Sequence, residues 1–152
     1  DAVKLEGGKS ISKIIKYLVQ RKVPVMGHIG LLPQHTRKFK LKGKSDLQKK
    51  KILSDAISIT NAGVFSVVIE CVVESLAKEI SKKINVPTIG IGASKNCDGQ
   101  ILVLDDMLGL TNYTPKFVKK YTNLKKNIEN SIKKYTADVK LRRFPSARNV
   151  YK

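Results

Sequence analysis

The sequence contains no Trp, only two Cys and two His, and few aromatic residues, which make up 6% of its 152 positions. No apolar run approaches the roughly 20 residues that a helix needs to cross a bilayer, and the N-terminus has no signal-peptide pattern. We therefore expect no membrane-spanning segment and no secretion. These absences favour a cytoplasmic or organellar protein, mitochondrial if the source is eukaryotic.

The cysteines and histidines do not form a recognisable metal or redox motif. Cys71 and Cys97 are 26 residues apart and lack a CxxC spacing, so we expect both to be reduced and structural. His28 and His35 are too few to form a zinc site without other ligands.

Acidic residues are scarce, with 12 against 30 basic residues and a formal net charge of +18. Such a charge is typical of nucleic-acid-binding proteins. However, 25 of the basic residues are Lys and only five are Arg, whereas base and phosphate recognition favours Arg. The Lys residues are spread over every predicted helix, and no aromatic stacking residues are interleaved with them. We expect a solvated basic surface and no nucleic-acid partner, with a basic nucleic-acid-binding module as the alternative.

Short apolar runs alternate with amphipathic helical patterns along the chain. The predicted strands are residues 2–5, 23–26, 64–69, 86–91 and 101–104. Ser10 is predicted to cap the first helix, and the second follows a basic loop at residues 35–44 and ends near Gly63. A third helix follows Glu70, and a last one is predicted from Thr114, with Pro115 at its first position. The apolar face of the last helix comprises Phe117, Tyr121, Leu124, Ile128, Ile132 and Tyr135.

Strands that alternate with helices predict an α/β fold with a parallel sheet. An open doubly wound sheet and a closed barrel both place ligands at the carboxyl ends of the strands. A strand that begins so close to Asp1 indicates missing upstream sequence, which favours a barrel, because a complete (β/α)8 barrel needs about 250 residues. We expect residues 1–152 to be the C-terminal part of one (β/α)8 barrel domain.

Charged residues stand at the ends of two predicted strands. Lys4 and Glu6 point to the same side of their strand, because side chains alternate with a period of two. They could form an ion pair, or Glu6 could bind a hard cation such as Mg²⁺ while Lys4 binds an anionic substrate.

Glu70 follows a strongly apolar strand, which withholds water from its carboxylate and favours a role as a base. The alternative is a structural carboxylate at the start of the next helix. His28, between Gly27 and Gly30, could donate a hydrogen bond to a ligand or to the local backbone.

Several blocks of sequence, in order, resemble the ketopantoate hydroxymethyltransferase family over essentially the whole chain. These blocks are residues 3–8 (VKLEGG), 24–34 (PVMGHIGLLPQ), 62–65 (AGVF), 69–72 (IECV), 87–93 (PTIGIGA), 97–100 (CDGQ), 116–119 (KFVK) and 144–145 (FP). The resemblance implies a (β/α)8 barrel of which this chain supplies about strands four to eight.

The same resemblance implies the chemistry. The family transfers a hydroxymethyl unit from 5,10-methylenetetrahydrofolate, its co-substrate, to the 2-oxo acid 3-methyl-2-oxobutanoate and gives 2-dehydropantoate for pantothenate and coenzyme A synthesis. By position, Glu6 matches a magnesium ligand, Lys4 a substrate-binding lysine, Glu70 the general base and His28 a supporting substrate-binding residue. The residues that bind the folate are not identified.

The family's other two metal ligands are aspartates on earlier strands, so we expect residues 1–152 alone to be inactive. The resemblance also implies a homo-oligomer. The alternative within enzymes is another Mg²⁺-dependent, enolate-forming barrel that acts on a 2-oxo acid.

Overall fold

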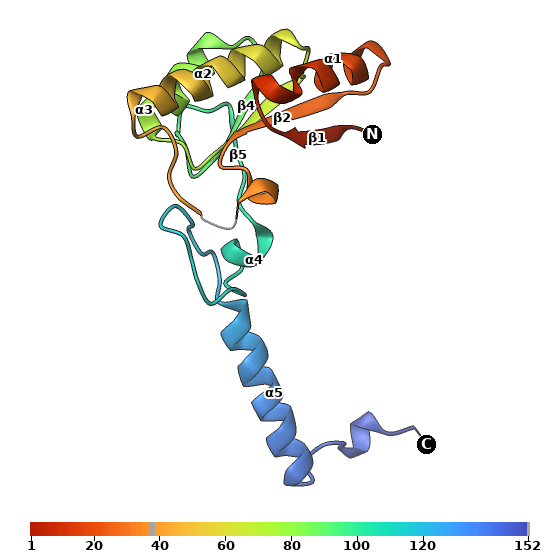
Figure 1. Ribbon diagram of the computed structural model, residues 1–152. Helices are drawn as coiled ribbons and strands as arrows, with labels where there is room; N and C mark the ends of the chain where they lie inside the picture. The colour runs from red at the N-terminus through yellow and green to blue at the C-terminus, as the bar shows by residue number, and fades with distance from the viewer. Residues whose placement is uncertain (37–38, 152) are drawn as a thin grey trace. The chain divides into compact units, whose positions relative to one another are not determined.

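The computed structural model describes residues 1–36 and 39–151 (Figure 1). Positions 37 and 38 of the predicted basic loop therefore lie outside the described residues. The chain divides into two compact units, residues 1–101 and residues 102–152.

The first unit contains a five-stranded parallel sheet. Its strands are β1 (Val3–Glu6), β2 (Val25–Gly30), β3 (Ser66–Glu70), β4 (Thr88–Ile91) and β5 (Gly99–Gln100). The strands lie side by side in chain order. This confirms the predicted α/β class, and the sequential order is that of consecutive barrel strands rather than of a doubly wound sheet, where the order reverses.

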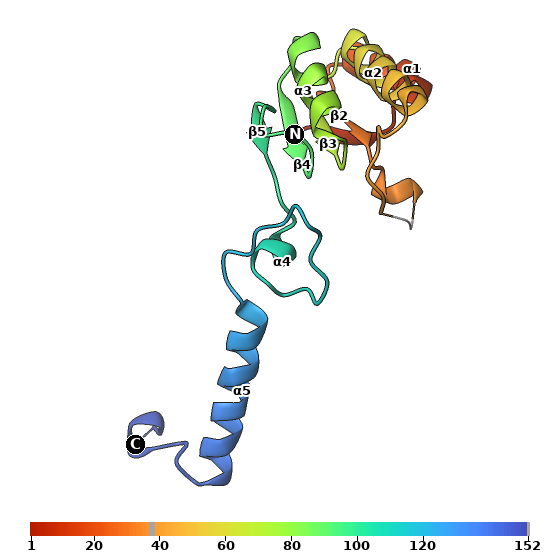
Figure 2. The same ribbon diagram turned by 90° about the vertical axis from the view of Figure 1, so that its left-hand side faces the viewer.

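Three helices cover one face of this sheet: α1 (Ser12–Gln20), α2 (Asp46–Asn61) and α3 (Glu74–Lys83). Both views show them together on the same side of the strands (Figures 1 and 2). Their buried residues Ile15, Ile59 and Ile80 form one core with Val67 and Ile69 of β3. The strands are thus fixed by a continuous apolar layer on their helix-covered face.

The first helix begins later than predicted. Ser10 lies in a single 3₁₀ turn (Lys9–Ile11), and its side chain caps no helix; the residue before α1 is Ile11. The Ser12 hydroxyl donates a hydrogen bond of 2.8 Å to the Lys9 carbonyl, and the Lys9 N–H donates one of 2.9 Å to the Asp55 carboxylate. These bonds stabilise the turn in place of a serine cap.

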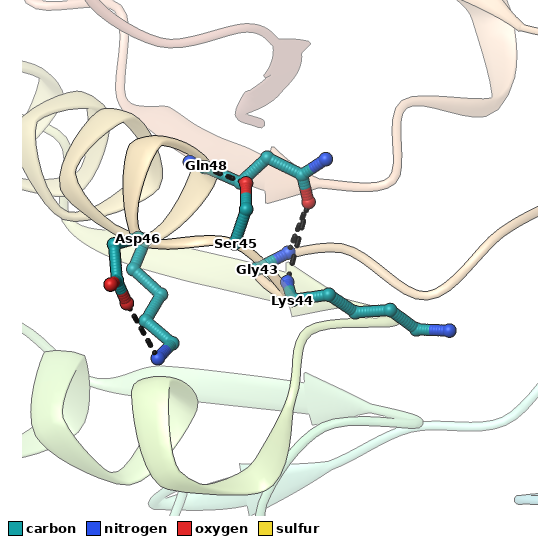
Figure 3. Close-up of polar contacts among 6 residues, drawn as sticks. Gly43, Lys44, Ser45, Asp46 and Gln48 are labelled. Carbon is teal, nitrogen blue, oxygen red and sulfur yellow. Dashed lines mark hydrogen bonds and ion pairs between the residues drawn. The ribbon is translucent and has the colours of Figure 1, made fainter.

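A reciprocal cap starts α2. The Ser45 hydroxyl accepts a hydrogen bond from the Gln48 backbone N–H at 3.3 Å, while the Gln48 side-chain oxygen accepts bonds from the N–H groups of Gly43 (3.0 Å) and Lys44 (3.3 Å) (Figure 3). The arrangement resembles a capping box, in which side chains satisfy the N–H groups that the first turn leaves unpaired. These bonds hold Gly43 and Lys44, at the end of the predicted basic loop, against the first turn of α2.

The predicted fifth strand, residues 101–104, is wrong. The strand is formed by Gly99 and Gln100, and a short helix, α4 (Leu104–Met107), follows. The reason is a side-chain contact: the Asp98 carboxylate accepts hydrogen bonds of 2.8 Å from both the backbone N–H and the hydroxyl of Thr88. This contact places the residues directly after Asp98 against β4.

The last helix is also shorter than predicted. Helix α5 spans Leu124–Lys140, and the Asn123 side chain caps it by accepting from the Lys126 N–H. Residues 115–121 form no helix, because the backbone N–H of Tyr121 bonds instead to the Met107 carbonyl at 2.8 Å. No helix within the described residues is both long and apolar enough to span a membrane.

Candidate active site

Three of the predicted site residues meet on the sheet face opposite the helices. Glu6 is the last residue of β1 and pairs in register with His28 of β2, and Glu70, the last residue of β3, pairs with Gly30. Because side chains alternate along a strand and in-register neighbours point the same way, Glu6, His28 and Glu70 share one face. Ile29, which alternates with them, lies in the helix-covered core.

The imidazole of His28 lies between the two carboxylates. His28 Nδ1 is 3.7 Å from Glu6 Oε1, and His28 Nε2 is 3.1 Å from Glu70 Oε2. All three side chains are largely buried, with exposed fractions of 6% for Glu6, 2% for His28 and 13% for Glu70. Neither ring nitrogen makes a well-aligned hydrogen bond to another described residue. The histidine ring is thus buried between the two carboxylates, and its two nitrogens are left without a well-aligned hydrogen bond among the described residues.

The backbone around Glu70 is firmly held. Its carbonyl accepts a 2.8 Å hydrogen bond from the Leu31 N–H, and the N–H of Cys71 donates one of 2.9 Å to the Ile91 carbonyl. Cys71 has a φ of 49°, a left-handed conformation that non-glycine residues rarely adopt. Burial, together with the nearby charge of Glu70, raises the pKa of the Cys71 thiol. The thiol therefore stays protonated at neutral pH.

The family assignment follows from sequence comparison. The sequence model of ketopantoate hydroxymethyltransferase matches residues 1–147. The chain belongs to the ketopantoate hydroxymethyltransferase family. It is 52% identical over 151 residues to a 3-methyl-2-oxobutanoate hydroxymethyltransferase of Pelagibacter ubique and 50% identical over 153 residues to one of Caulobacter vibrioides (strain NA1000 / CB15N). A Kosmotoga olearia protein of the same name is 46% identical over 155 residues.

The predicted resemblance is thus confirmed. These alignments cover 99% of this chain but only 59%, 56% and 58% of the three relatives, in the same order. The chain therefore spans less than two thirds of the length of these members of the ketopantoate hydroxymethyltransferase family.

Lys4, the fourth predicted site residue, forms no ion pair with the other three. It is exposed on β1, in register with Met26 and two residues before Glu6, and so on the same face. Within the described residues no ion pair joins it to Glu6, whose charged contact is with His28. The simple Lys4–Glu6 ion pair, one of the two alternatives from the sequence, is not formed.

Sequence reasoning missed two backbone contributions to this family site. The Gln34 N–H donates a 3.0 Å hydrogen bond to Glu6 Oε2, so the turn after β2 orients the Glu6 carboxylate. Gly30 has a φ of 95°, and a Cβ placed on it would lie 2.3 Å from the Glu70 carbonyl oxygen. Gly30 itself could be read from the sequence, but its contact with Glu70 depends on the pairing of β2 with β3.

The residues present fit one part of a site for a hard cation. Carboxylate oxygens are the ligands that Mg²⁺ prefers, and Glu6 offers two of them at a strand end. Within the described residues, 1–36 and 39–151, no three His, Cys, Asp or Glu side chains are grouped in a way that would hold a metal ion. Glu6 therefore fits as a single ligand, and further ligands would have to come from elsewhere.

Proposed function

We propose that the intact protein transfers a hydroxymethyl unit from 5,10-methylenetetrahydrofolate to 3-methyl-2-oxobutanoate and forms 2-dehydropantoate, a step toward pantothenate. Membership of the family and the names of the related proteins support the reaction. The observation that carries the proposal is the contact chain Glu6–His28–Glu70 at the carboxyl ends of parallel strands, where barrel enzymes place their chemistry.

In this proposal Glu70 is the general base. The hydrogen on the third carbon of the 2-oxo acid is weakly acidic, so its removal needs a base held directly over it. Glu70 projects from the end of a buried strand, and its carbonyl and the next N–H are both hydrogen bonded. The proton moves from the substrate carbon to a Glu70 carboxylate oxygen, and the resulting carbanion forms a carbon–carbon bond to the one-carbon unit. Both bonds from that unit to the folate nitrogens break, tetrahydrofolate leaves, and water supplies the oxygen of the hydroxymethyl group.

Glu6 would hold Mg²⁺, together with ligands from outside this chain. When bound, the ion would supply Lewis-acid polarisation of the substrate's keto oxygen. The Gln34 N–H binds Oε2 of Glu6, and the other oxygen, Oε1, lies 3.7 Å from His28 Nδ1.

The remaining two residues would position the substrate. His28, 3.1 Å from Glu70, limits the directions in which that carboxylate can turn, and a ring N–H can donate to the substrate. The Lys4 ammonium lies on the same face and forms no ion pair with any of the described carboxylates, and this charge suits the carboxylate of the 2-oxo acid. The homo-oligomer, the inactivity of residues 1–152 alone and the compartment stay predictions.

The test is Glu70→Gln in the intact protein. We expect exchange of the third-carbon hydrogen of 3-methyl-2-oxobutanoate with deuterated solvent, followed by proton NMR, to fall at least about 100-fold, which is the usual contribution of a general base. Glu79→Gln makes the same change of charge and shape on the exposed side of α3 and serves as the matched control. Exchange at the wild-type rate in the Glu70 variant would exclude Glu70 as the base.

A further inference from the structure

A second cavity lies on the helix-covered side of the strand ends. It has a volume of about 280 Å³ and is bounded by the turn after β1, the end of β2 and the first half of α2. Ile29 lines it, and Ile29 points away from the face that carries Glu6, His28 and Glu70. We call this space the α2 cavity, and it is separate from the candidate active site.

The charged groups around the α2 cavity leave one positive charge uncompensated. Lys51 and Asp55, which both line it, form an ion pair of 2.7 Å, and Asp55 also accepts the Lys9 N–H. Lys42 lines the cavity and is half-buried, yet none of the described carboxylates lies within ion-pair distance of it. A partly desolvated, unpaired ammonium is unfavourable unless an anion accompanies it.

The backbone of Lys42 is rigidly placed. Its N–H donates a 2.8 Å hydrogen bond to the Cys71 carbonyl, and its own carbonyl accepts one of 3.0 Å from the Val73 N–H, which extends the pairing beyond β3. The following Gly43 N–H is bound by the Gln48 side-chain oxygen (Figure 3). Because that oxygen is occupied, the Gln48 amide presents its N–H₂ donors for further contacts. The cavity wall thus offers preorganised hydrogen-bond donors.

The rest of the lining is apolar. Ile29 and Ile52 are buried core residues, and Leu32 lies beside them in the turn after β2. A ligand for this site would therefore combine a charged group with a short hydrocarbon part, since small-molecule sites pair an apolar lining with a few placed polar groups.

We propose that the α2 cavity binds a small organic anion, with a carboxylate or phosphate group against Lys42 and Gln48 and a short apolar part against Ile29 and Ile52. The small volume fits a metabolite rather than a large cofactor. The site goes beyond the proposed reaction, because it lies outside the face on which the base and the metal ligand stand.

The test measures binding to the intact protein by isothermal titration calorimetry at constant ionic strength. The probes are inorganic phosphate, glycerol 3-phosphate and glutarate. We expect Lys42→Gln to weaken binding of the preferred anion about tenfold, as expected for loss of one charge-assisted hydrogen bond. Lys44→Gln removes the same charge two residues away, outside the cavity lining, and should change the affinity less than about twofold. Preference for glycerol 3-phosphate would identify a phosphate ligand, and preference for glutarate a carboxylate ligand.

Two outcomes would overturn the proposal. One is equal weakening by Lys42→Gln and Lys44→Gln, which would show general attraction to a basic surface. The other is a dissociation constant above about 10 mM for all three probes in the unmodified protein. Ser10→Leu, at an exposed lining position, should block binding without loss of a charge. Glu70→Gln should leave anion binding unchanged, so failure here is distinguishable from failure of the proposed reaction.

Discussion

Replacement of Gly30 by alanine should damage both the fold and the alignment of Glu70. Gly30 and Gly63 have nearly the same positive φ, 95° and 98°. A Cβ at Gly30 would lie 2.3 Å from the backbone oxygen of Glu70 and 2.6 Å from a Val72 methyl group. At Gly63 the three nearest atoms all belong to the Val19 side chain, the closest at 3.0 Å. The two substitutions therefore share the conformational cost and differ in the contact.

The magnitudes can be separated on this basis. A left-handed conformation costs an L-residue about 1–2 kcal/mol, which is the whole expected effect of Gly63→Ala because the Val19 side chain can move. At Gly30 the clash is with backbone, so about 1–3 kcal/mol of overpacking is added. Disturbance of the 2.8 Å bond from the Leu31 N–H to the Glu70 carbonyl adds about 1 kcal/mol. We expect Gly30→Ala to cost at least about 2 kcal/mol more than Gly63→Ala.

Urea denaturation of both intact variants, followed by circular dichroism at one fixed protein concentration, measures this difference. Substrate hydrogen exchange, measured at a temperature where both variants are folded, should fall further in Gly30→Ala. Equal destabilisation by the two substitutions would refute the reasoning, because it would mean that the contact with β3 adds nothing to the conformational cost.

Three other changes test separate parts of the structure. Ser45→Ala should lower the free energy of unfolding by about 1 kcal/mol through loss of the α2 cap, whereas Ser45→Asp, which keeps an acceptor, should not; urea midpoints distinguish them. The Thr88 backbone N–H and hydroxyl lower the pKa of Asp98, so its stabilising contribution is complete above about pH 4 and is lost as the pH falls through the folded-state pKa. Asp98→Asn should therefore flatten the decline in stability between neutral and acid pH, and an unchanged decline would contradict this. Glu6→Ala should reduce the Mg²⁺ dependence of substrate exchange far more than it lowers the thermal unfolding temperature, and an unchanged Mg²⁺ requirement would count against Glu6 as a ligand.

The positions of Glu6 and Glu70 could be predicted from the sequence because each directly follows a short apolar run. The strand that carries His28 was predicted to end at Met26, since glycines usually interrupt strands. Gly27 is instead needed inside β2, where a Cβ would lie 2.6 Å from Ile59 Cδ1 of α2. Close packing between a helix and a strand far apart in sequence leaves no local signal.

The errors near the C-terminus have the same origin. The apolar run at residues 101–104 looked like a strand, but the contact between Asp98 and Thr88 determines where β5 forms. Thr114 and Pro115 are a good helix start in isolation, yet a tertiary hydrogen bond between Tyr121 and Met107 prevails. Local patterns predicted that a strand and a helix form in this part of the chain, and non-local hydrogen bonds determined where β5 lies and where α5 begins.

The two edge strands of the sheet differ in the length of backbone that is available for pairing with a further strand. At one margin β5 has only two residues, which leaves little backbone for pairing, while at the other β1 is a four-residue strand. An additional parallel strand would add at β1, about 4.8 Å away. Its carboxyl end would then lie beside Glu6, so that the residue at the end of that strand would stand next to the Glu6 carboxylate. The exposed margin at β1 therefore lies on the Glu6 side of the candidate site.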